Sequence, residues 1–216
     1  HVADELLMGK SLTSELAMRQ TVVFQRAIDA GRTSLTEPEA KRLIASFGIP
    51  VPAGCQIDVK NAHDLSAAAS LHAPLAVKVI SADVLHKSES GGVELHLADM
   101  SAVAAAIDAV AARHQGVAVE GYLVEEMARP GVELVIGGTV DTSFGPTLLV
   151  GIGGVFVEVL DDVSMRLCPI TRDDAREMLA SLRGAALLGG VRGRPAIKLD
   201  AVLDAMLAIG GTNGLL

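Results

Sequence analysis

Aromatic residues are scarce in this chain of 216 residues, which contains no Trp, one Tyr and four Phe. Proteins that bind single-stranded nucleic acid without sequence preference stack its bases on aromatic side chains. The formal net charge is −8, and the chain has no run of Lys and Arg of the kind that marks a nucleic-acid surface. We therefore expect no nucleic-acid partner, and a bound purine would lie between aliphatic side chains.

Cysteines and long apolar segments are also few. Cys55 and Cys168 are the two cysteines of the chain, and their isolation is typical of reduced thiols in a cytosolic protein rather than of a metal or redox site. The longest uncharged stretch, residues 142–157, is rich in glycine and shorter than the roughly 20 residues of a membrane-spanning helix. The N-terminus lacks the order of a signal peptide. We expect a cytoplasmic protein that binds no membrane.

The residues that are present predict an α+β fold. Half of them are apolar and a fifth are charged, which is typical of a globular protein. Hydrophobic spacing and capping residues predict helices at 12–30, 36–48, 61–73, 101–110, 171–182 and 198–209. Strands are expected at 54–59, 75–80, 93–97, 122–127, 132–140, 147–150, 155–160 and 166–170. Hairpins covered by helices favour two α+β lobes over a doubly wound sheet.

The segment from Leu75 to Val93 is the most informative part of the chain. An apolar run carries Lys78 at its centre, and a polar loop containing His86 follows, closed by Gly91 and Gly92. This order predicts a strand, a loop in which backbone N–H groups can converge, and a second strand. With cationic side chains at its base, such a loop is suited to hold a phosphate.

Two residues of this segment allow alternative interpretations. Lys78 among apolar neighbours needs an anionic partner, which a nucleotide phosphate would supply; the alternative is an edge strand with Lys78 facing water. His86 could accept a phosphoryl group, because neutral imidazole is nucleophilic near pH 7. The alternative is a solvated loop histidine.

Acidic residues form the second set of candidates. Glu125 and Glu126 end a predicted strand, where a carboxylate could bind a ribose hydroxyl; exposed charge at a strand end is the alternative. Glu133 allows the same two interpretations. Glu158 follows a glycine-rich segment that lacks the G-x-G-x-x-G spacing of dinucleotide-binding loops. A G-K-S/T phosphate loop, hydrolase elbows and His/Cys metal clusters are also absent from the sequence.

Taken together and in order, ten short motifs resemble one family. These motifs are Leu35–Lys41, Phe47–Pro52, Val77–Val79, His86–Val93, Val124–Met127, Gly131–Leu134, Phe144–Pro146, Gly151–Val159, Cys168–Ile170 and Gly190–Gly193. Over about residues 33–210, the chain resembles the ATP-grasp domain of the NDP-forming acyl-CoA synthetases. In that family the domain is the β subunit of ADP-forming acetyl-CoA synthetase, or is fused behind CoA-binding and ligase domains.

The resemblance implies an ATP-grasp fold in which two lobes clamp ATP or ADP with Mg²⁺. It implies that His86 relays a phosphoryl group between the ligase part and the nucleotide during the interconversion of acyl-CoA and acid. Lys78 would hold nucleotide phosphate, Glu125 to Met127 would bind adenine, and Glu133 would lie by the ribose or phosphates. The complete set of expected nucleotide-binding residues is Lys78, Lys87, Ser88, Gly91, Gly92, Glu125, Glu126, Met127, Glu133 and Glu158.

One departure from the family pattern concerns the metal. The family continues into an acidic-x-x-Asn-Pro motif and a further acid that resemble Mg²⁺ ligands, whereas this chain stops at Leu216. We therefore expect no metal ligand within the chain, metal ligands beyond residue 216, and truncated C-terminal strands. The expected domains are a helical tether at 1–32, a first lobe with the His86 loop at 33–123, and an incomplete second lobe at 124–216.

The resemblance also sets the expected partners. The chain would act as part of an ADP-forming acid–CoA ligase, as an oligomer, with an α subunit or fused domains that bind CoA, acyl-CoA and carboxylic acid. One alternative is a non-catalytic nucleotide-sensing or regulatory domain of a larger protein. Another is a ligase that joins a carboxylate to an amine, but the sequence His86-Lys87-Ser88 favours the first hypothesis, because such ligases need no phosphohistidine.

Overall fold

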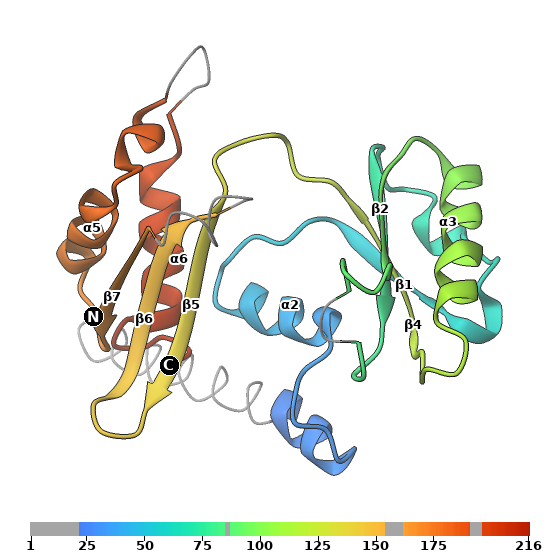
Figure 1. Cartoon of the computed structure of the whole chain (residues 1–216), viewed down its shortest axis with the longest axis horizontal. Helices are drawn as coiled ribbons and strands as arrows, with labels where there is room; N and C mark the ends of the chain where they lie inside the picture. The colour runs from blue at the N-terminus through green and yellow to red at the C-terminus, as the bar shows by residue number, and fades with distance from the viewer. Residues whose placement is uncertain (1–21, 85–86, 154–161, 191–195) are drawn as a thin grey trace, which may run out of the picture. The chain divides into compact units, whose positions relative to one another are not determined.

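The computed structural model describes residues 22–84, 87–153, 162–190 and 196–216 (Figure 1). The chain divides into two compact units. Unit 1 comprises His1–Ala45 and Pro50–Arg129, and unit 2 comprises Ser46–Ile49 and Pro130–Leu216. The lobes expected from the sequence, 33–123 and 124–216, stay a prediction. Residues 22–29, within the expected tether, are helical.

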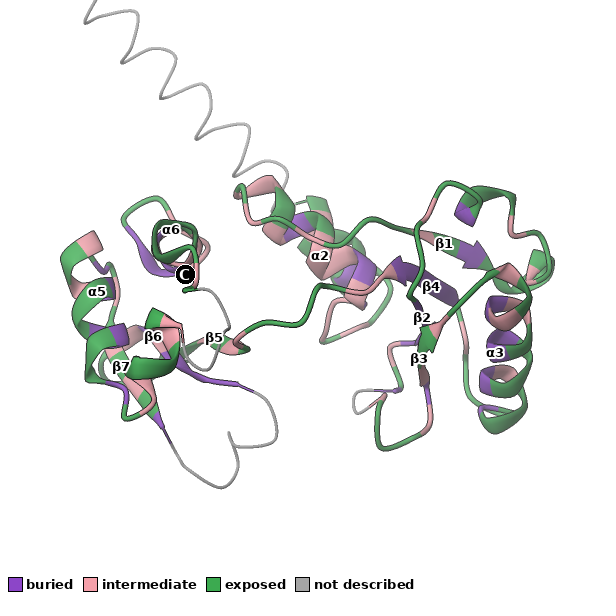
Figure 2. Cartoon of the chain, turned by 90° about the horizontal axis from the view of Figure 1, so that it is seen from above, coloured by how far each residue is buried: buried purple, intermediate pink, exposed green. Residues whose placement is uncertain are grey.

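Unit 1 is built on a four-stranded antiparallel sheet with the order β1-β4-β2-β3. Its strands are β1 (Gly54–Asp58), β2 (Leu75–Ile80), β3 (Val93–Leu97) and β4 (Gly121–Glu126). The helix α3 (Met100–Arg113) packs on β2 and β3. Figure 2 shows the buried residues gathered on β2, β4 and one side of α3. The core of unit 1 therefore lies between this sheet and α3.

Lys78 lies on an interior strand of that sheet. Strand β2 pairs with β4 on one side and with β3 on the other, so the interpretation of Lys78 as an edge-strand residue is wrong. Val77 and Val79 are fully buried in the core with α3. Because successive side chains of a strand point to opposite faces, Lys78 is directed to the face away from this core.

Local side-chain hydrogen bonds determine where the helices of unit 1 begin. Helix α2 (Glu37–Ser46) follows Thr36, and the carboxylate of Glu39 accepts a hydrogen bond from the Thr36 backbone N–H at 2.8 Å, which is one of the two hydrogen bonds of a capping box. Asp99 caps α3 by accepting from the N–H of Ala102 at 2.8 Å. These contacts satisfy N–H groups that a helix start otherwise leaves unpaired.

The helix predicted at 61–73 is wrong. Two short 3-10 helices stand there, η1 (Val59–Asn61) and η2 (Ser66–Ala68). The side chains of Asp58 and Asp64 accept hydrogen bonds from the backbone N–H groups two residues later, at 2.7 and 3.1 Å. Such local hydrogen bonds compete with an α-helix, which explains why Asn61 and Asp64 were misleading as signals of a helix start.

Unit 2 is a three-stranded antiparallel sheet with helices on one face. Strands β5 (Leu134–Asp141), β6 (Gly145–Ile152) and β7 (Val163–Leu167) lie in the order β5-β6-β7. Helices α5 (Arg172–Ser181) and α6 (Leu199–Gly210) pack against each other and on the sheet, and η3 (Ala185–Gly189) connects them. The buried residues Leu148, Met178, Leu203 and Met206 belong to its core. The strand expected at 155–160 lies outside the described residues.

Three further observations concern unit 2 and the helices. The predicted start of α5 is confirmed, since Thr171 and Asp174 form a reciprocal capping box. Strand β7 begins three residues before the predicted start at Arg166. In the part of the chain that the structure describes, no helix combines the length and the apolar composition needed to span a bilayer.

Candidate functional site

Five charged side chains of unit 1 meet on the face of the sheet away from α3. We call them the Lys–Glu cluster: Glu37, Lys41, Lys78, Lys87 and Glu125. Helix α2 supplies the first two from consecutive turns, β2 and the loop after it supply Lys78 and Lys87, and β4 supplies Glu125. The pairing of β2 with β4 places Lys78 opposite Leu123 and Ala76 opposite Glu125. Lys78 and Glu125 are therefore diagonal neighbours on one face.

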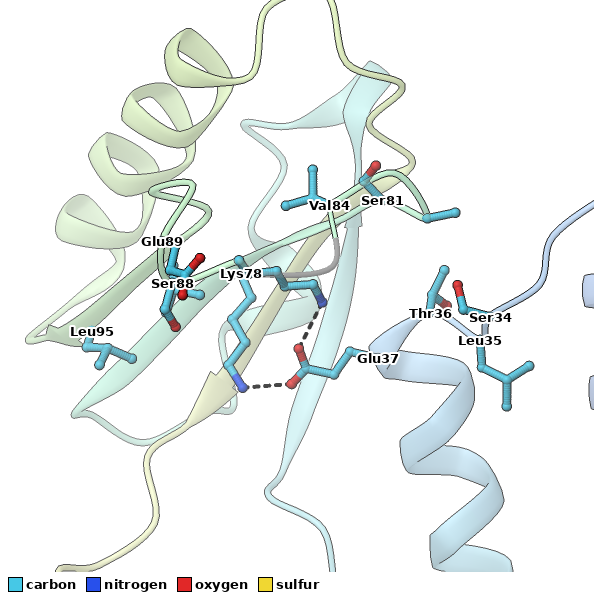
Figure 3. Close-up of a pocket in the computed structure, with 13 residues that line it drawn as sticks. Ser34, Leu35, Thr36, Glu37, Lys78, Ser81, Val84, Ser88, Glu89 and Leu95 are labelled. Atoms are coloured by element: carbon cyan, nitrogen blue, oxygen red, sulfur yellow. Dashed lines mark hydrogen bonds and ion pairs between the residues drawn. The ribbon is translucent and has the colours of Figure 1, made fainter. Parts of the chain in front are cut away.

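Glu37 is the residue of the cluster that contacts all three lysines. Its Oε1 accepts from Lys78 Nζ at 2.7 Å and lies 3.0 Å from Lys41 Nζ. Its Oε2 accepts from Lys87 Nζ at 3.0 Å, and Figure 3 shows the carboxylate of Glu37 between two lysine side chains. Burial raises the pKa of Glu37, but hydrogen bonds from Lys78, Lys41 and Lys87 outweigh it and lower the pKa to about 2. The carboxylate is therefore ionised at neutral pH.

Glu125 is the most deeply buried acid of the cluster. It is 4% exposed and pairs with Lys78 at 2.5 Å and with Lys41. The alternative of an exposed charge at a strand end is thus wrong for Glu125. Burial lowers the pKa of Lys78, but hydrogen bonds to Glu125 and Glu37 raise it above its ordinary value. Lys78 is therefore a permanent cation, as binding of a phosphate requires.

A cavity of about 660 Å³ adjoins the cluster in unit 1 (Figure 3). Glu37, Lys78, Lys87 and Ser88 line it, together with apolar residues such as Leu95. Ligand pockets of this size combine an apolar wall with a few polar groups that orient the ligand. The lining of the cavity therefore includes two ammonium groups, both bonded to Glu37, and the hydroxyl of Ser88.

Two glycines close the loop that follows β2. The N–H of Gly92 donates to the carbonyl oxygen of Lys87 at 2.7 Å, and the N–H of Gly91 donates to that of Ser88 at 3.4 Å. Gly91 has a φ of +70°, and a Cβ on Gly92 would lie 2.7 Å from Cγ1 of Val79. The N–H groups of the two glycines therefore bond to carbonyls of the loop itself, and a role of this loop in holding a phosphate stays a prediction. His86 itself lies outside the described residues.

The end of β4 holds the remaining candidates of unit 1. Glu126 accepts from the backbone N–H of His72 at 2.8 Å and lies 2.9 Å from its Nδ1. These contacts, the backbone one first, lower the pKa of Glu126. Met127 donates its N–H to the carbonyl of Pro74 and accepts from the N–H of His96 through Sδ at 3.1 Å. Backbone and side-chain contacts therefore hold this segment beside the cluster.

The other two predicted residues belong to unit 2 or fall outside the description. Glu133 is exposed, and its carbonyl accepts from the N–H of Gly153 at 2.7 Å. Glu158 lies outside the described residues. Roles for both stay predictions. No group of three His, Cys, Asp or Glu side chains suited to a metal is found among the described residues.

Sequence reasoning missed two members of the cluster, Glu37 and Lys41. Both lie in the segment Leu35–Lys41, which predicts a helix start and is one of the family motifs. Neither residue was expected to belong to the site. Their spacing of four residues places an acid and a base on one face of α2. That spacing, beside a strand with a lysine at its centre, was the available signal.

Comparisons with known proteins identify the family of the chain. The sequence model of a family described as ATP-grasp domain matches residues 26–211. Acetate–CoA ligase (ADP-forming) I of Archaeoglobus fulgidus is 38% identical over 191 residues, which are 87% of this chain and 27% of that protein. Subunit beta of acetate–CoA ligase (ADP-forming) II of Pyrococcus furiosus is 32% identical over 191 residues, 87% of this chain and 80% of that protein.

A solved structure shows the same similarity. Dinucleotide-forming acetyl-coenzyme A synthetase 1 of Ca. Korarchaeum cryptofilum, with coenzyme A and Mg-AMPPCP, superposes with a TM-score of 0.74 at 37% identity, covering 88% of this chain and 83% of that one. There a phosphohistidine segment points towards the nucleotide-binding site. In another structure of that protein, with a TM-score of 0.77 at 35% identity and coverage of 88% and 84%, the segment is phosphorylated and in a site I orientation.

Proposed function

This chain belongs to the ATP-grasp domain family, and from that premise we propose that it is the nucleotide-binding part of an ADP-forming acid–CoA ligase. The overall reaction would convert acyl-CoA, ADP and phosphate into carboxylic acid, CoA and ATP, in either direction. The chain spans 27% of the length of the Archaeoglobus relative and 80% of the Pyrococcus beta subunit. Domains or a subunit outside it would bind CoA and the acyl group.

The observation that carries the proposal is the pair Lys78 and Lys87 at one wall of the cavity. A transferring phosphoryl group has little covalent chemistry for the protein to perform, so positioning and charge neutralisation dominate its catalysis. Lys78 and Lys87 would neutralise the phosphate oxygens, and the hydroxyl of Ser88 would donate a hydrogen bond. Glu125, Glu126 and Met127 would contact the nucleoside, with Glu133 and Glu158 as further contacts.

His86 would carry the phosphoryl group. In one route, an imidazole nitrogen would attack the phosphorus of an acyl phosphate and expel the carboxylate. In the other, the imidazole would receive the phosphoryl group from a histidine of the ligase part, which is thereby freed. The phosphoryl group would then pass to the terminal oxygen of ADP, which frees the imidazole and forms ATP. The position of His86 directly before Lys87 in the sequence supports this role.

A metal ion fits the described residues poorly. Glu37 and Glu125 are already neutralised by lysines, and the described residues contain no cluster suited to a metal. Mg²⁺ accompanies the nucleotide analogue in the Korarchaeum structure. We propose that Mg²⁺ enters with the nucleotide on ligands outside the described residues.

The test uses the assembled enzyme, in which this chain is fused to or combined with its CoA-binding and ligase partners. Titration with ADP measures nucleotide binding, and incubation with acyl-CoA and ³²P-phosphate measures labelling of histidine. We expect ADP to bind and His86→Asn to abolish the label in this chain. His63→Asn is the matched control, because His63 is exposed and distant in sequence from the loop.

Four outcomes would separate the hypotheses. Loss of the label in His86→Asn but not in His63→Asn supports the relay. Full turnover in His86→Asn contradicts it. ADP binding without any labelled histidine favours a nucleotide-sensing domain, and absence of ADP binding contradicts the nucleotide site itself.

A further inference from the structure

Glu37 joins three separate elements of unit 1. It lies in the first turn of α2, bonds through Oε1 to Lys78 in β2, and bonds through Oε2 to Lys87 in the loop after β2. Each oxygen thus holds a different lysine that lines the cavity (Figure 3). A carboxylate that contacts two ammonium groups at once fixes their separation as well as their orientation.

The two lysines depend on Glu37 to different degrees. Lys78 has a second carboxylate partner, Glu125, which is buried. For Lys87, the ion pair found among the described residues is the one with Glu37. If Glu37 lost its charge, Lys78 would keep a partner in place, whereas Lys87 would be released.

Lys87 is held in place through both its backbone and its side chain. Its carbonyl oxygen accepts the N–H of Gly92 at 2.7 Å, and the carbonyl of Gly92 accepts the N–H of Val79 at 2.8 Å. The backbone of Lys87 is therefore tied to β2, and its side chain is tied to α2 through Glu37. These two attachments hold the residue that directly follows His86 in the sequence.

We propose that Glu37 is a positioning residue for phosphoryl transfer, which holds Lys87 beside Lys78 so that both cations contact one phosphoryl group. This inference rests on the proposed function. Glu37 is negatively charged, like a phosphate, and would not contact the phosphoryl group. Glu37 acts through Lys87. When the Glu37 carboxylate is removed, phosphoryl transfer should become slow while ADP binding stays nearly normal, since Lys78 remains in place.

The test is a double-mutant cycle in the assembled enzyme. We expect E37Q and K87Q each to lower kcat for ATP formation about 10- to 100-fold, the range for residues that orient a group in contact with a ligand. The KM for ADP should change less than about threefold. The double variant E37Q/K87Q should be no slower than K87Q, because two residues that act as one unit give non-additive effects.

Glu39 provides the matched control. It lies on the same helix and its pKa is also lowered to about 2, first by the hydrogen bond from Arg32, but it contacts no lysine of the cluster. E39Q should therefore reduce thermal stability and leave kcat unchanged. If E37Q fails to fold, E37D serves instead, because its carboxylate is one methylene shorter and cannot span both lysines.

The outcomes distinguish this inference from the proposed function. If the parent enzyme binds ADP and labels His86 but E37Q keeps its full kcat, the role of Glu37 is wrong. If the losses in E37Q and K87Q multiply in the double variant, Glu37 does not act through Lys87, and the inference is equally wrong. A parent enzyme that neither binds ADP nor labels His86 overturns the proposed function, and this inference with it.

Discussion

The two units of the chain place their charged residues differently. In unit 1, the Lys–Glu cluster lies within the fold, and Glu125 is 4% exposed. In unit 2, the ion pairs between the two helices lie at the surface: Arg172 of α5 bonds to Asp200 and Asp204 of α6, whose side chains are 81% and 67% exposed. Both units have an apolar core of their own.

This difference supports the proposal that the Lys–Glu cluster serves a ligand. Exposed pairs contribute little to stability because water screens them. Buried charges lose their hydration, and the attraction between them often repays only part of that cost. A cluster of three lysines and two glutamates is therefore expected where a ligand needs it, and it carries one positive charge in excess. That excess suits an anionic ligand in unit 1.

The largest expected effect comes from removing the central cation of the cluster. Lys78→Met would leave Glu125 with one lysine partner and should lower the free energy of unfolding by about 3 kcal/mol. ADP affinity should fall more than about tenfold, because a charge-assisted contact to phosphate is lost. Denaturant unfolding and ADP titration measure the two effects.

The control for this variant is Lys60→Met, at an exposed position of η1. It should change stability by less than about 0.5 kcal/mol. Equal losses in the two variants would show that the cluster contributes no more than a surface lysine, and the contrast between clustered and exposed charges would fail.

A smaller effect is expected from the loop of unit 1. In Gly92→Ala, the new Cβ would lie 2.7 Å from Cγ1 of Val79 and 3.2 Å from the carbonyl oxygen of Lys87. The strain should cost about 1–3 kcal/mol and displace Lys87. The temperature of thermal unfolding and the rate of ATP formation should both decrease.

Gly189 in unit 2 is the matched position, because a Cβ there would meet no atom within 4 Å. Gly189→Ala should leave stability and rate unchanged. An unchanged rate in Gly92→Ala as well would mean that the loop geometry does not matter for transfer.

A pH titration compares the stability of the parent with that of E37Q, in which Glu37 is replaced by an uncharged residue. The pKa of Glu37 is about 2 against an ordinary 4.5, so its ion pairs stabilise the fold above pH 4.5 and lose this contribution as the pH falls towards 2. The difference in the free energy of unfolding between the parent and E37Q should therefore shrink by about 1–2 kcal/mol across this range, once solvent screening is allowed for. Urea unfolding at pH 5, 4 and 3 measures it, and a constant difference would contradict the ion pairs.

The smallest effect is expected at the surface of unit 2. Arg172→Gln removes the ion pairs to α6 and should cost less than about 1 kcal/mol. Added salt should reduce the difference between parent and variant further, because exposed pairs are screened. A loss as large as that of Lys78→Met would show that the ion pairs of unit 2 are as important as the buried cluster.

Much of the fold could be predicted from the order of residues. Alternation and apolar runs placed β2 and β3 correctly, and capping residues placed the starts of α2 and α5, since these signals are local. The ATP-grasp fold expected from the motifs is confirmed by the family match over residues 26–211. The helix expected at 61–73 failed because aspartate side chains bond to nearby backbone groups, and residues such as Asn61 and Asp64 favour such turns as well as helix starts.

The candidate site was predictable in part for a similar reason. Lys78 stood out because a lysine within an apolar strand needs a partner. The identity of that partner depends on strand order and helix packing: Glu125 is 47 residues away in the sequence, and Glu37 precedes Lys78 by 41. Contacts of such range leave no mark in local spacing.

The sequence by itself thus determined the family, the helices and strands with local signals, and the cationic loop that contains His86. The tertiary structure alone decided that Lys78 lies on an interior strand and that Glu37 and Glu125 neutralise it. The physical reason is that the low polarity of a packed sheet makes an unpaired charge costly, and only the packing of α2 and β4 beside β2 reveals which side chains meet that need.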